Sequence, residues 1–449
     1  MAELLAVCIT LPLIAAITAS RSRARGIAIG ALGITVALLL GVLRSVLAGT
    51  AGASGAWLIA DELNAVPMVL FAAIALVTVI AAPRRDMNRR FLESVLILTS
   101  STLTAYAAAN HLVFLGGWIA SVLPFIFTNR SAFIRVPLVG SVLALITAVI
   151  LIGPATGFGV SSAGPWAFGL LVLAVILREH IVPFHRATVE LFDDSPMLLA
   201  TLLVNSHLGV FLIARMVIPA FPGTAGVALP WLGGVALFAS LYTAVLGIAE
   251  RAPRRILAML IASQSSAILA GLATTSHEGI AGALIQWIVL AVSSTMLIVV
   301  YRSLEVRIDR PFLGRGFMGL ASCMPRLAVF FAISGLTLVG LPGTLGFAGE
   351  DLLLHGVLAQ YPWWGAALPV AIALNAYHAF RLFAHLFLGK DEITHNTSAD
   401  ALPRERWALS ACLAFLVWGG LVPRMVVALQ APATAELVRM TGSNSPSHP

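Results

Sequence analysis

Charged side chains are scarce in this chain. Of its 449 residues, 10% are charged and 59% are hydrophobic, whereas a soluble globular domain has about 25% charged residues. Apolar surface on this scale must face lipid or other helices. The composition therefore excludes a water-soluble protein and predicts an integral membrane protein.

Lysine and cysteine are also rare. Lys390 is the only lysine among 27 basic residues. The formal net charge of +7 does not indicate nucleic-acid binding, because the arginines lie in short gaps between apolar runs, as membrane topology requires. Cys8, Cys323 and Cys412 lie within or beside apolar sequence and lack metal-ligand spacing, so we interpret them as small apolar residues. The sequence has no redox or nucleotide motif, and we expect no cofactor or metal.

Apolar stretches of about 17–25 residues recur along the chain and predict roughly fourteen transmembrane helices. The predicted spans are 3–19, 26–48, 65–83, 92–109, 111–128, 136–153, 165–185, 196–219, 228–249, 254–273, 279–301, 326–358, 364–388 and 406–429. We therefore expect an all-α polytopic membrane protein with one transmembrane domain, residues 1–430. The polar tail, residues 431–449, is predicted to be disordered.

The distribution of arginine predicts how the protein is oriented in the membrane. The gaps that follow odd-numbered spans hold most of the basic residues, including Arg84, Arg85, Arg254 and Arg255, and the gaps that follow even-numbered spans hold almost none. Positive charge stays on the cytoplasmic side of a membrane. Both termini are therefore predicted to face outside.

Ionisable residues interrupt span seven. Arg178, Glu179 and His180 are followed by Pro183 and His185, and proline removes a backbone donor and breaks a helix. A charged residue in the middle of a membrane costs about 2.5–3.5 kcal/mol, so each one needs a reason. We expect a broken helix that lines a hydrated cavity. The alternative is the cytoplasmic end of span seven, with solvated charges.

A second interruption lies in span twelve. Residues 340–351 contain four glycines and a proline before Glu350 and Asp351, with His355 one turn further on. The surrounding apolar stretch is too long for one straight helix and predicts a helix broken in mid-membrane. The alternative is a loop between two short helices, capped by Glu350 and Asp351. Two broken helices five spans apart are typical of inverted-repeat transporters, here about 92–219 and 228–388.

Other polar residues lie within the spans. His207, beside Asn205 and Ser206 on span eight, is a candidate proton relay because imidazole titrates near neutral pH. The alternative is a histidine that only makes a hydrogen bond between helices. On span thirteen, His378 and Arg381 approach the cytoplasmic end, where long side chains extend toward water.

At these residues the chain resembles the antiporter-like membrane subunits of respiratory complex I, Mrp-type cation/proton antiporters and membrane-bound hydrogenases. The resemblance covers about residues 60–390. The motifs that carry it are 182–185 with 195–196 and 209–215, then 252–258, and then 324–326 through 341–350. It implies fourteen core helices in two inverted five-helix repeats, with helices seven and twelve broken. It also implies a multi-pass protein of the bacterial inner membrane that moves protons along ionisable residues and has no redox site of its own.

The resemblance carries over to individual residues unevenly. Glu350 falls on the ionisable position of span twelve, and His207 lies near that of span eight. Arg178 stands where the family has a lysine, and Ile119 stands where it has a glutamate. Arginine does not release its proton, so we expect the proton route to be intact mainly in the second half. The predicted proton-pathway residues are Glu350, Arg178, His207, Asp351, His355, Glu179 and His378.

The expected partners follow from the same resemblance. They are the lipid bilayer, other membrane subunits, and either a soluble redox module or the zinc-containing carbonic-anhydrase-like subunit of inorganic-carbon uptake complexes. Residues 183–186 are similar to the membrane subunit of those uptake complexes, whereas 341–351 look more like complex I. The main alternative is a degenerate, non-conducting scaffold subunit, which Ile119 and Arg178 favour. A stand-alone transporter for an organic solute is a third possibility.

Overall fold

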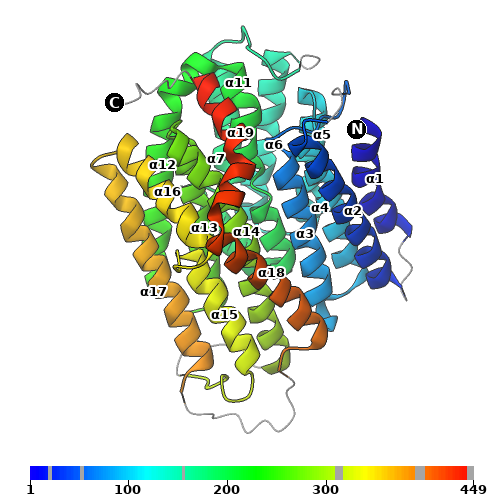
Figure 1. Ribbon diagram of the computed structural model, residues 1–449, viewed down its shortest axis with the longest axis vertical. Helices are drawn as coiled ribbons and strands as arrows, with labels where there is room; N and C mark the ends of the chain where they lie inside the picture. The colour runs from blue at the N-terminus through cyan, green and yellow to red at the C-terminus, as the bar shows by residue number, and fades with distance from the viewer. Residues whose placement is uncertain (19–22, 51–54, 154–156, 309–316, 390–399, 442–449) are drawn as a thin grey trace.

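The computed structural model describes residues 1–18, 23–50, 55–153, 157–308, 317–389 and 400–441. Within these ranges the chain is helical apart from short connections and two isolated β-bridges, Leu58 with Ala108 and Asn110 with Gly157. The helices run side by side along the long axis of the molecule (Figure 1). The prediction of an all-α polytopic fold is confirmed.

The first six predicted spans each correspond to one helix. They are α1 (Ala2–Thr18), α2 (Ala24–Leu47), α3 (Ala65–Ala81), α4 (Arg89–Tyr106), α5 (His111–Thr128) and α6 (Ala132–Ile152). A short 3-10 turn, η1 (Arg84–Asp86), connects α3 to α4. The backbone before α3 pairs with the backbone after α4, through Ile59 N–H to Ala107 O at 2.8 Å and Ala109 N–H to Trp57 O at 3.0 Å. These bonds fix one end of the bundle.

Spans seven and eight are both interrupted. Span seven consists of α7 (Pro165–Arg178) and α8 (Arg186–Asp194), which confirms the predicted break. Span eight, predicted at 196–219, is confirmed as one membrane-length segment, Met197–Ala220, although its helix is locally irregular. It consists of α9 (Met197–Asn205), α10 (Leu208–Leu212), a π-helical turn η2 (Ile213–Val217) and α11 (Ile218–Ala220). The break falls at His207, whose φ of +39° is left-handed, a backbone conformation that ends regular helical hydrogen bonding.

The second half contains α12 (Pro222–Ala249), α13 (Pro253–Leu272), α14 (His277–Ile308), α15 (Pro325–Leu338), α16 (Leu345–Gln360), a 3-10 turn η3 (Trp364–Ala366) and α17 (Ala367–Phe387). Span twelve is divided between α15 and α16, as predicted. The two breaks therefore lie in the fourth span of each predicted repeat, although the repeat boundaries at about 92–219 and 228–388 stay predictions.

The C-terminal region differs from the prediction. Span fourteen is two helices, α18 (Pro403–Leu421) and α19 (Pro423–Thr441), bent by 85°. Pro423 begins the second helix, because proline lacks the N–H that would continue the first. The prediction that the tail is disordered is wrong for residues 431–441, which belong to α19, and residues 442–449 lie outside the described residues.

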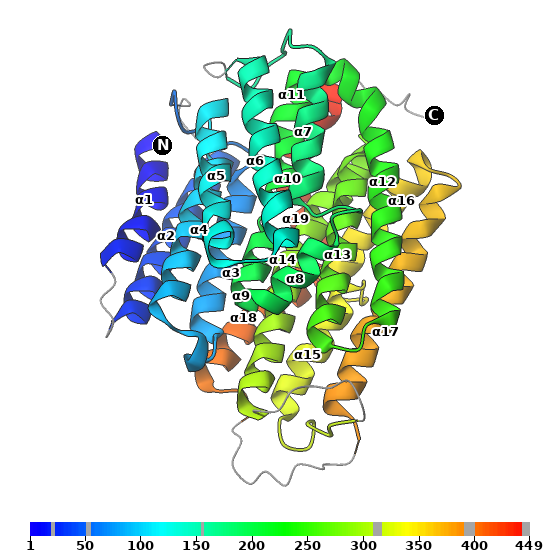
Figure 2. The ribbon, with the colours of Figure 1, turned by 180° about the vertical axis from the view of Figure 1, so that it is seen from behind.

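The N-terminus and the C-terminal end of α19 lie in the upper half of Figures 1 and 2, whereas α15 and α18 lie toward the lower end. Among the described residues, eight helices are individually long and apolar enough to cross a membrane, and shorter apolar helices include α1, α3, α7 and α15. The interrupted spans account for part of the difference from the predicted number, because a break divides one crossing into short pieces.

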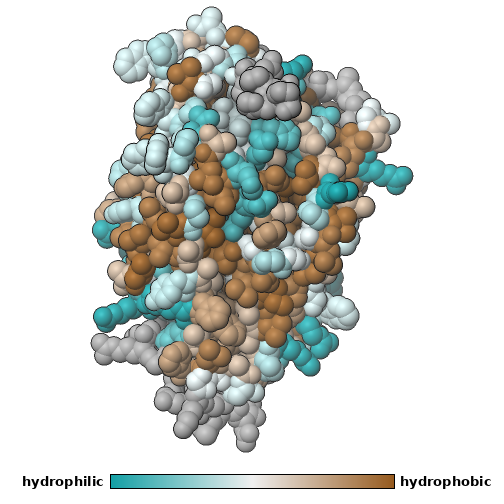
Figure 3. All heavy atoms as spheres, turned by 60° about the vertical axis from the view of Figure 1, so that its left-hand side comes forward, coloured by the Kyte–Doolittle hydropathy of each residue, from teal (hydrophilic) through white to brown (hydrophobic). Residues whose placement is uncertain are grey.

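Burial separates the central helices from the outer ones. In the membrane-length segments of α13 and α14, 94% and 100% of the residues are buried, whereas in those of α2 and α17 only 33% are. Hydrophobic side chains cover much of the middle of the face shown in Figure 3, and hydrophilic ones lie both above and below them. The core that holds polar residues away from lipid is therefore built around α13 and α14.

Candidate functional site

The break in span seven places ionisable side chains inside the protein. The α7 helix ends at Arg178, and Glu179 to His185 connect it to α8. Arg178 is 5% exposed and His180 is 4% exposed. The alternative of a solvated helix end is therefore wrong for these residues. Pro183 cannot donate a backbone hydrogen bond, so the chain leaves the helix while it is still within the bundle.

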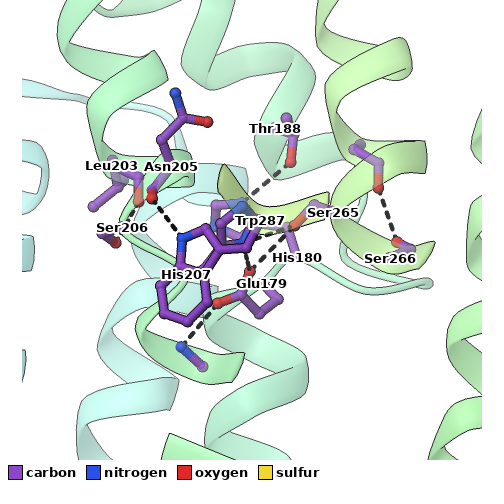
Figure 4. A network of polar contacts seen from close by, with 12 residues as sticks. Glu179, His180, Thr188, Leu203, Asn205, Ser206, His207, Ser265, Ser266 and Trp287 are labelled. Carbon is purple, nitrogen blue, oxygen red and sulfur yellow. Dashed lines mark hydrogen bonds and ion pairs between the residues drawn. The ribbon is translucent and has the colours of Figure 1, made fainter. Parts of the chain in front are cut away.

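Glu179 lies between two other helices and is held by three donors (Figure 4). The Gly209 N–H donates to its carboxylate at 2.8 Å, Ser265 Oγ donates at 3.3 Å, and His207 Nδ1 lies 3.3 Å away. A Cβ at Gly209 would lie 2.6 Å from Glu179 Cγ. Glycine is therefore needed for α10 to approach the carboxylate.

His207 links this carboxylate to α13. The imidazole is fully buried and packs edge-on against Trp287 at 5.6 Å, while Nδ1 lies 3.4 Å from Ser265 Oγ. Because Nδ1 faces the Glu179 carboxylate, it acts as the donor. The neighbouring Asn205 bonds Ser294 Oγ at 2.9 Å, which is the interhelical role expected for such a side chain. His207 differs because its bond is to an ionisable group.

Arg178 does not pair with Glu179, the carboxylate nearest to it in sequence. Its guanidinium donates to Ser121 Oγ at 3.0 Å and lies 5.2 Å from the Trp118 ring, a cation–π distance. No described carboxylate lies within ion-pair distance of it. Both contacts come from α5, which also carries Ile119. Arg178 is thus a fixed buried cation beside the proton-pathway candidates.

The middle of α13 carries four consecutive buried polar residues that the sequence reasoning missed. These are Ser263, Gln264, Ser265 and Ser266. Neighbouring residues of a helix point about 100° apart, so one short segment reaches several partners. Ser265 contacts Glu179, as described above. The Gln264 carbonyl accepts from Gln286 Nε2 of α14 at 3.2 Å. The signal that would have found them is four adjacent polar residues within an otherwise apolar span.

Glu350 lies just after the second break. The α16 helix begins at Leu345 with Thr344 as its N-cap, so the alternative that Glu350 caps the helix is wrong. Glu350 is 8% exposed, and its Oε2 lies directly against Gly340, whose φ is +76°. The Gln264 amide approaches the carboxylate, but Oε1 has no hydrogen-bond partner among the described residues.

The buried polar contacts continue from α13 to α17. Asn375 Nδ2 donates to Ser263 Oγ at 2.9 Å, and His378 Nε2 donates to Ala244 O at 2.7 Å. His378 is fully buried, so the prediction that it extends toward water is wrong. Arg381 does extend to the end of the neighbouring α12, where it donates to Glu250 O at 2.7 Å.

Asp351 and His355 lie elsewhere. Their side chains are 53% and 68% exposed and face one another one turn apart on α16, with His355 Nδ1 3.6 Å from Asp351 Oδ1. The structure therefore brings Glu179, His207 and Glu350 into the same buried region and leaves Asp351 and His355 on the surface.

Unpartnered buried polar atoms gather along this region. Those of the described residues that line it are Arg178 Nη1, His180 Nε2, His207 Nε2, Gln264 Nε2, Gln286 Oε1, Glu350 Oε1, Asn375 Oδ1 and His378 Nδ1. Buried polar groups almost always have partners, either in the protein or in ordered water. These atoms leave hydrogen-bonding capacity in the buried region that ordered water could satisfy. The described residues hold no group of three His, Cys, Asp or Glu that could bind a metal ion.

Comparison with known proteins decides the family. Residues 147–374, half of the chain, match the family model described as "NADH:quinone oxidoreductase/Mrp antiporter, TM". The chain belongs to this family. Relatives include the NADH-quinone oxidoreductase subunit M of Rickettsia bellii, 24% identical over 64% of this chain and 61% of the relative. That of Mycobacterium tuberculosis is 25% identical over 64% of this chain and 52% of the relative. The chain thus spans about half to three fifths of these relatives.

Solved structures of this family share the fold. A chain of respiratory complex I from Thermus thermophilus superposes with a TM-score of 0.85 at 22% identity, over 98% of this chain and 100% of that one. A chain of the Mrp complex from Dietzia sp. DQ12-45-1b gives 0.82 at 19% identity, over 98% of this chain and 100% of that one. The antiporter-like membrane fold expected from the sequence is confirmed.

Proposed function

We propose that this chain is a proton-translocating, antiporter-like membrane subunit of a multi-subunit complex. In this proposal protons move laterally, in the plane of the membrane, between Glu179 and Glu350, by way of His207 and the polar segment of α13. One observation carries the proposal. The buried carboxylates at the two helix breaks approach one helix, α13: Ser265 donates to Glu179, and its neighbour Gln264 lies near Glu350, with Nε2 lacking a hydrogen-bond partner among the described residues.

His207 supplies the first transfer. A neutral imidazole donates from one ring nitrogen and accepts at the other, so a proton received at Nε2 allows release from Nδ1. Nδ1 faces Glu179, and Nε2 has no partner among the described residues. The ring is thus placed to pass a proton to the carboxylate or to take one from it.

Gln264 and Gln286 occupy the stretch between His207 and Glu350. Amides donate and accept hydrogen bonds but do not ionise, so they orient water and do not carry the proton themselves. Each amide retains one unpartnered atom, Gln264 Nε2 and Gln286 Oε1. Glu350 terminates this stretch with a carboxylate oxygen that is free to accept a proton.

Asn375 and His378 extend the route toward the arginine-rich end. His378 has an unpartnered Nδ1, and one turn further along α17 Arg381 lines a surface cavity of about 380 Å³. This cavity offers an opening to water. By the positive-inside rule this end is cytoplasmic, and both termini face outside.

Arg178 acts in this proposal as a fixed charge and not as a carrier, because a guanidinium keeps its proton. The partners are other membrane subunits, since the structural relatives come from a respiratory complex I and an Mrp complex. A soluble redox module fits the first of these and is part of the proposal only as the source of driving energy.

A Glu350→Gln variant tests the proposal in the assembled complex reconstituted into vesicles. We expect proton-coupled activity to fall about tenfold or more, because glutamine does not ionise. The matched control is Asp351→Asn, the next residue on the same helix, with an exposed side chain; its activity should stay within about twofold. Unchanged activity in Glu350→Gln, with assembly intact, would favour the non-conducting scaffold.

A further inference from the structure

A basic cavity of about 590 Å³ lies where the start of α18 meets the end of α14 and the connection that follows α3. Its charged lining consists of Arg84, Arg307, Arg404 and Glu405. Three arginines and one glutamate give a formal charge of 3 − 1 = +2. This cavity lies outside the buried polar region that contains Glu179 and Glu350, and nothing in the proposed function uses it.

The single carboxylate of the cavity is already engaged. Glu405 is 1% exposed, accepts from Arg307 Nη2 at 2.6 Å, and accepts from the Leu402 N–H at 3.0 Å. It therefore offsets one arginine and closes the first turn of α18. The positive charge of the other two arginines has no matching carboxylate in the lining.

Two guanidinium atoms in the cavity lack partners. Arg307 Nη1 and Arg404 Nε are both buried and bond no other described residue. Unpartnered buried donors on charged groups are costly unless an acceptor satisfies them. Arg25 lies within electrostatic range of Arg84 and Arg404 and adds to the positive potential. The N-terminal end of α18, which begins at Pro403 in the lining, adds a partial positive charge.

The cavity lies at a membrane–water boundary. It belongs to the arginine-rich end of the bundle, and Trp407, one turn along α18 from Pro403, is 72% exposed. Exposed tryptophan at the end of a membrane helix is typical of the headgroup level. Basic pockets between helices at this depth bind the headgroups of anionic lipids.

We propose that this cavity binds the phosphate group of an anionic phospholipid. Guanidinium groups match phosphate oxygens through paired N–H donors, and a phosphodiester would accept from both Arg307 Nη1 and Arg404 Nε. Inorganic phosphate has the same chemistry, but the lipid is favoured because the cavity lies at the start of α18, whose exposed Trp407 marks the headgroup level.

Native mass spectrometry of the purified full-length protein tests the site. Phosphatidylglycerol and phosphatidylcholine are offered separately. We expect the wild type to retain phosphatidylglycerol preferentially, and Arg404→Gln to weaken that retention about fivefold. The matched control is Arg406→Gln, which removes the same charge on the same helix outside the lining and should change retention less than about twofold. The exposed Arg84 gives a second variant, Arg84→Gln, that leaves the Glu405 contacts intact and should also weaken retention.

Three outcomes would overturn the proposal. Equal retention of the two lipids by the wild type would exclude recognition of the anionic headgroup. Equal losses in Arg404→Gln and Arg406→Gln would indicate only general surface attraction. Thermal protection by inorganic phosphate alone, as large as that by phosphatidylglycerol, would replace the lipid with a free anion.

Discussion

Two buried carboxylates lie at corresponding breaks in this protein, and their surroundings differ. Glu179 is held by the Gly209 N–H, Ser265 and His207. Glu350 lies against Gly340, with one carboxylate oxygen lacking any partner among the described residues. Each carboxylate packs against a glycine at a helix break, but only the first is fixed by hydrogen bonds.

The difference suggests different roles along one route. A carboxylate with three donors is held in place, whereas one with a free oxygen is able to change partners, as proton exchange requires. Arg178 strengthens the contrast, because a permanent cation lies near Glu179. In these terms Glu179 is the fixed end of the proposed route, which exchanges a proton only with His207, and Glu350 is the end that can change partners.

The largest effect is expected from Gly340→Ala. Its φ of +76° disfavours any side chain, and the new Cβ would collide with Glu350 Oε2. We expect a loss of about 2–3 kcal/mol of unfolding free energy, because the strained backbone is unchanged and the buried carboxylate must move aside, measured by denaturant unfolding in detergent. Gly343→Ala is the matched control, because its φ is +86° but nothing lies within 4 Å; it should lose only about 1–2 kcal/mol. Equal losses would contradict the close packing of Glu350 on Gly340.

The two glutamates should respond differently to amide substitution. Glu179→Gln replaces one acceptor oxygen with a donor and leaves at least one of its three partners unmatched, so we expect a loss of about 1–3 kcal/mol in unfolding free energy. Glu350→Gln should lose less than about 1 kcal/mol, because fewer bonds depend on it. Both variants are measured in the same unfolding assay. Equal losses of unfolding free energy would contradict the difference between the two carboxylates.

Ser265→Ala should have a smaller effect on stability but a measurable one on transport. It removes the hydroxyl that lies near both Glu179 and His207. We expect the unfolding free energy to fall by about 1 kcal/mol. We also expect the proton-coupled transport rate to fall about fivefold, which corresponds to about 1 kcal/mol of activation free energy. Ser266→Ala is the control, because that hydroxyl donates to Ala262 O of its own helix. A rate loss in Ser266→Ala as large as in Ser265→Ala would contradict a specific role of Ser265 in proton transfer.

Asp351→Asn should change least. The exposed Asp351–His355 pair contributes about 0–1 kcal/mol, as surface ion pairs do, and no side-chain hydrogen bond or ion pair among the described residues joins it to Glu350. Thermal unfolding of Asp351→Asn and His355→Ala should match the wild type within that range. A loss comparable with that of Glu179→Gln would show that this pair is part of the buried network.

Sequence reasoning identified the two breaks because glycine, proline and charge are visible in an apolar run. Pro183 and Gly340 gave local signals that the backbone must leave the helix. It missed the break at His207, where no proline or glycine precedes the left-handed residue. It also missed Ser263 to Ser266, because uncharged polar residues fit within a membrane helix without a large penalty.

The sequence by itself determined the membrane class, the helical fold and the two predicted breaks, and it singled out Glu350 as a candidate. These follow from hydropathy and local backbone chemistry, which act over a few residues at a time. Only the tertiary structure decided that Glu179 bonds His207 while Arg178 faces α5, that α13 approaches both carboxylates, and that Asp351 is exposed. Such outcomes depend on which helix faces which, and packing between distant segments is what sets those pairings.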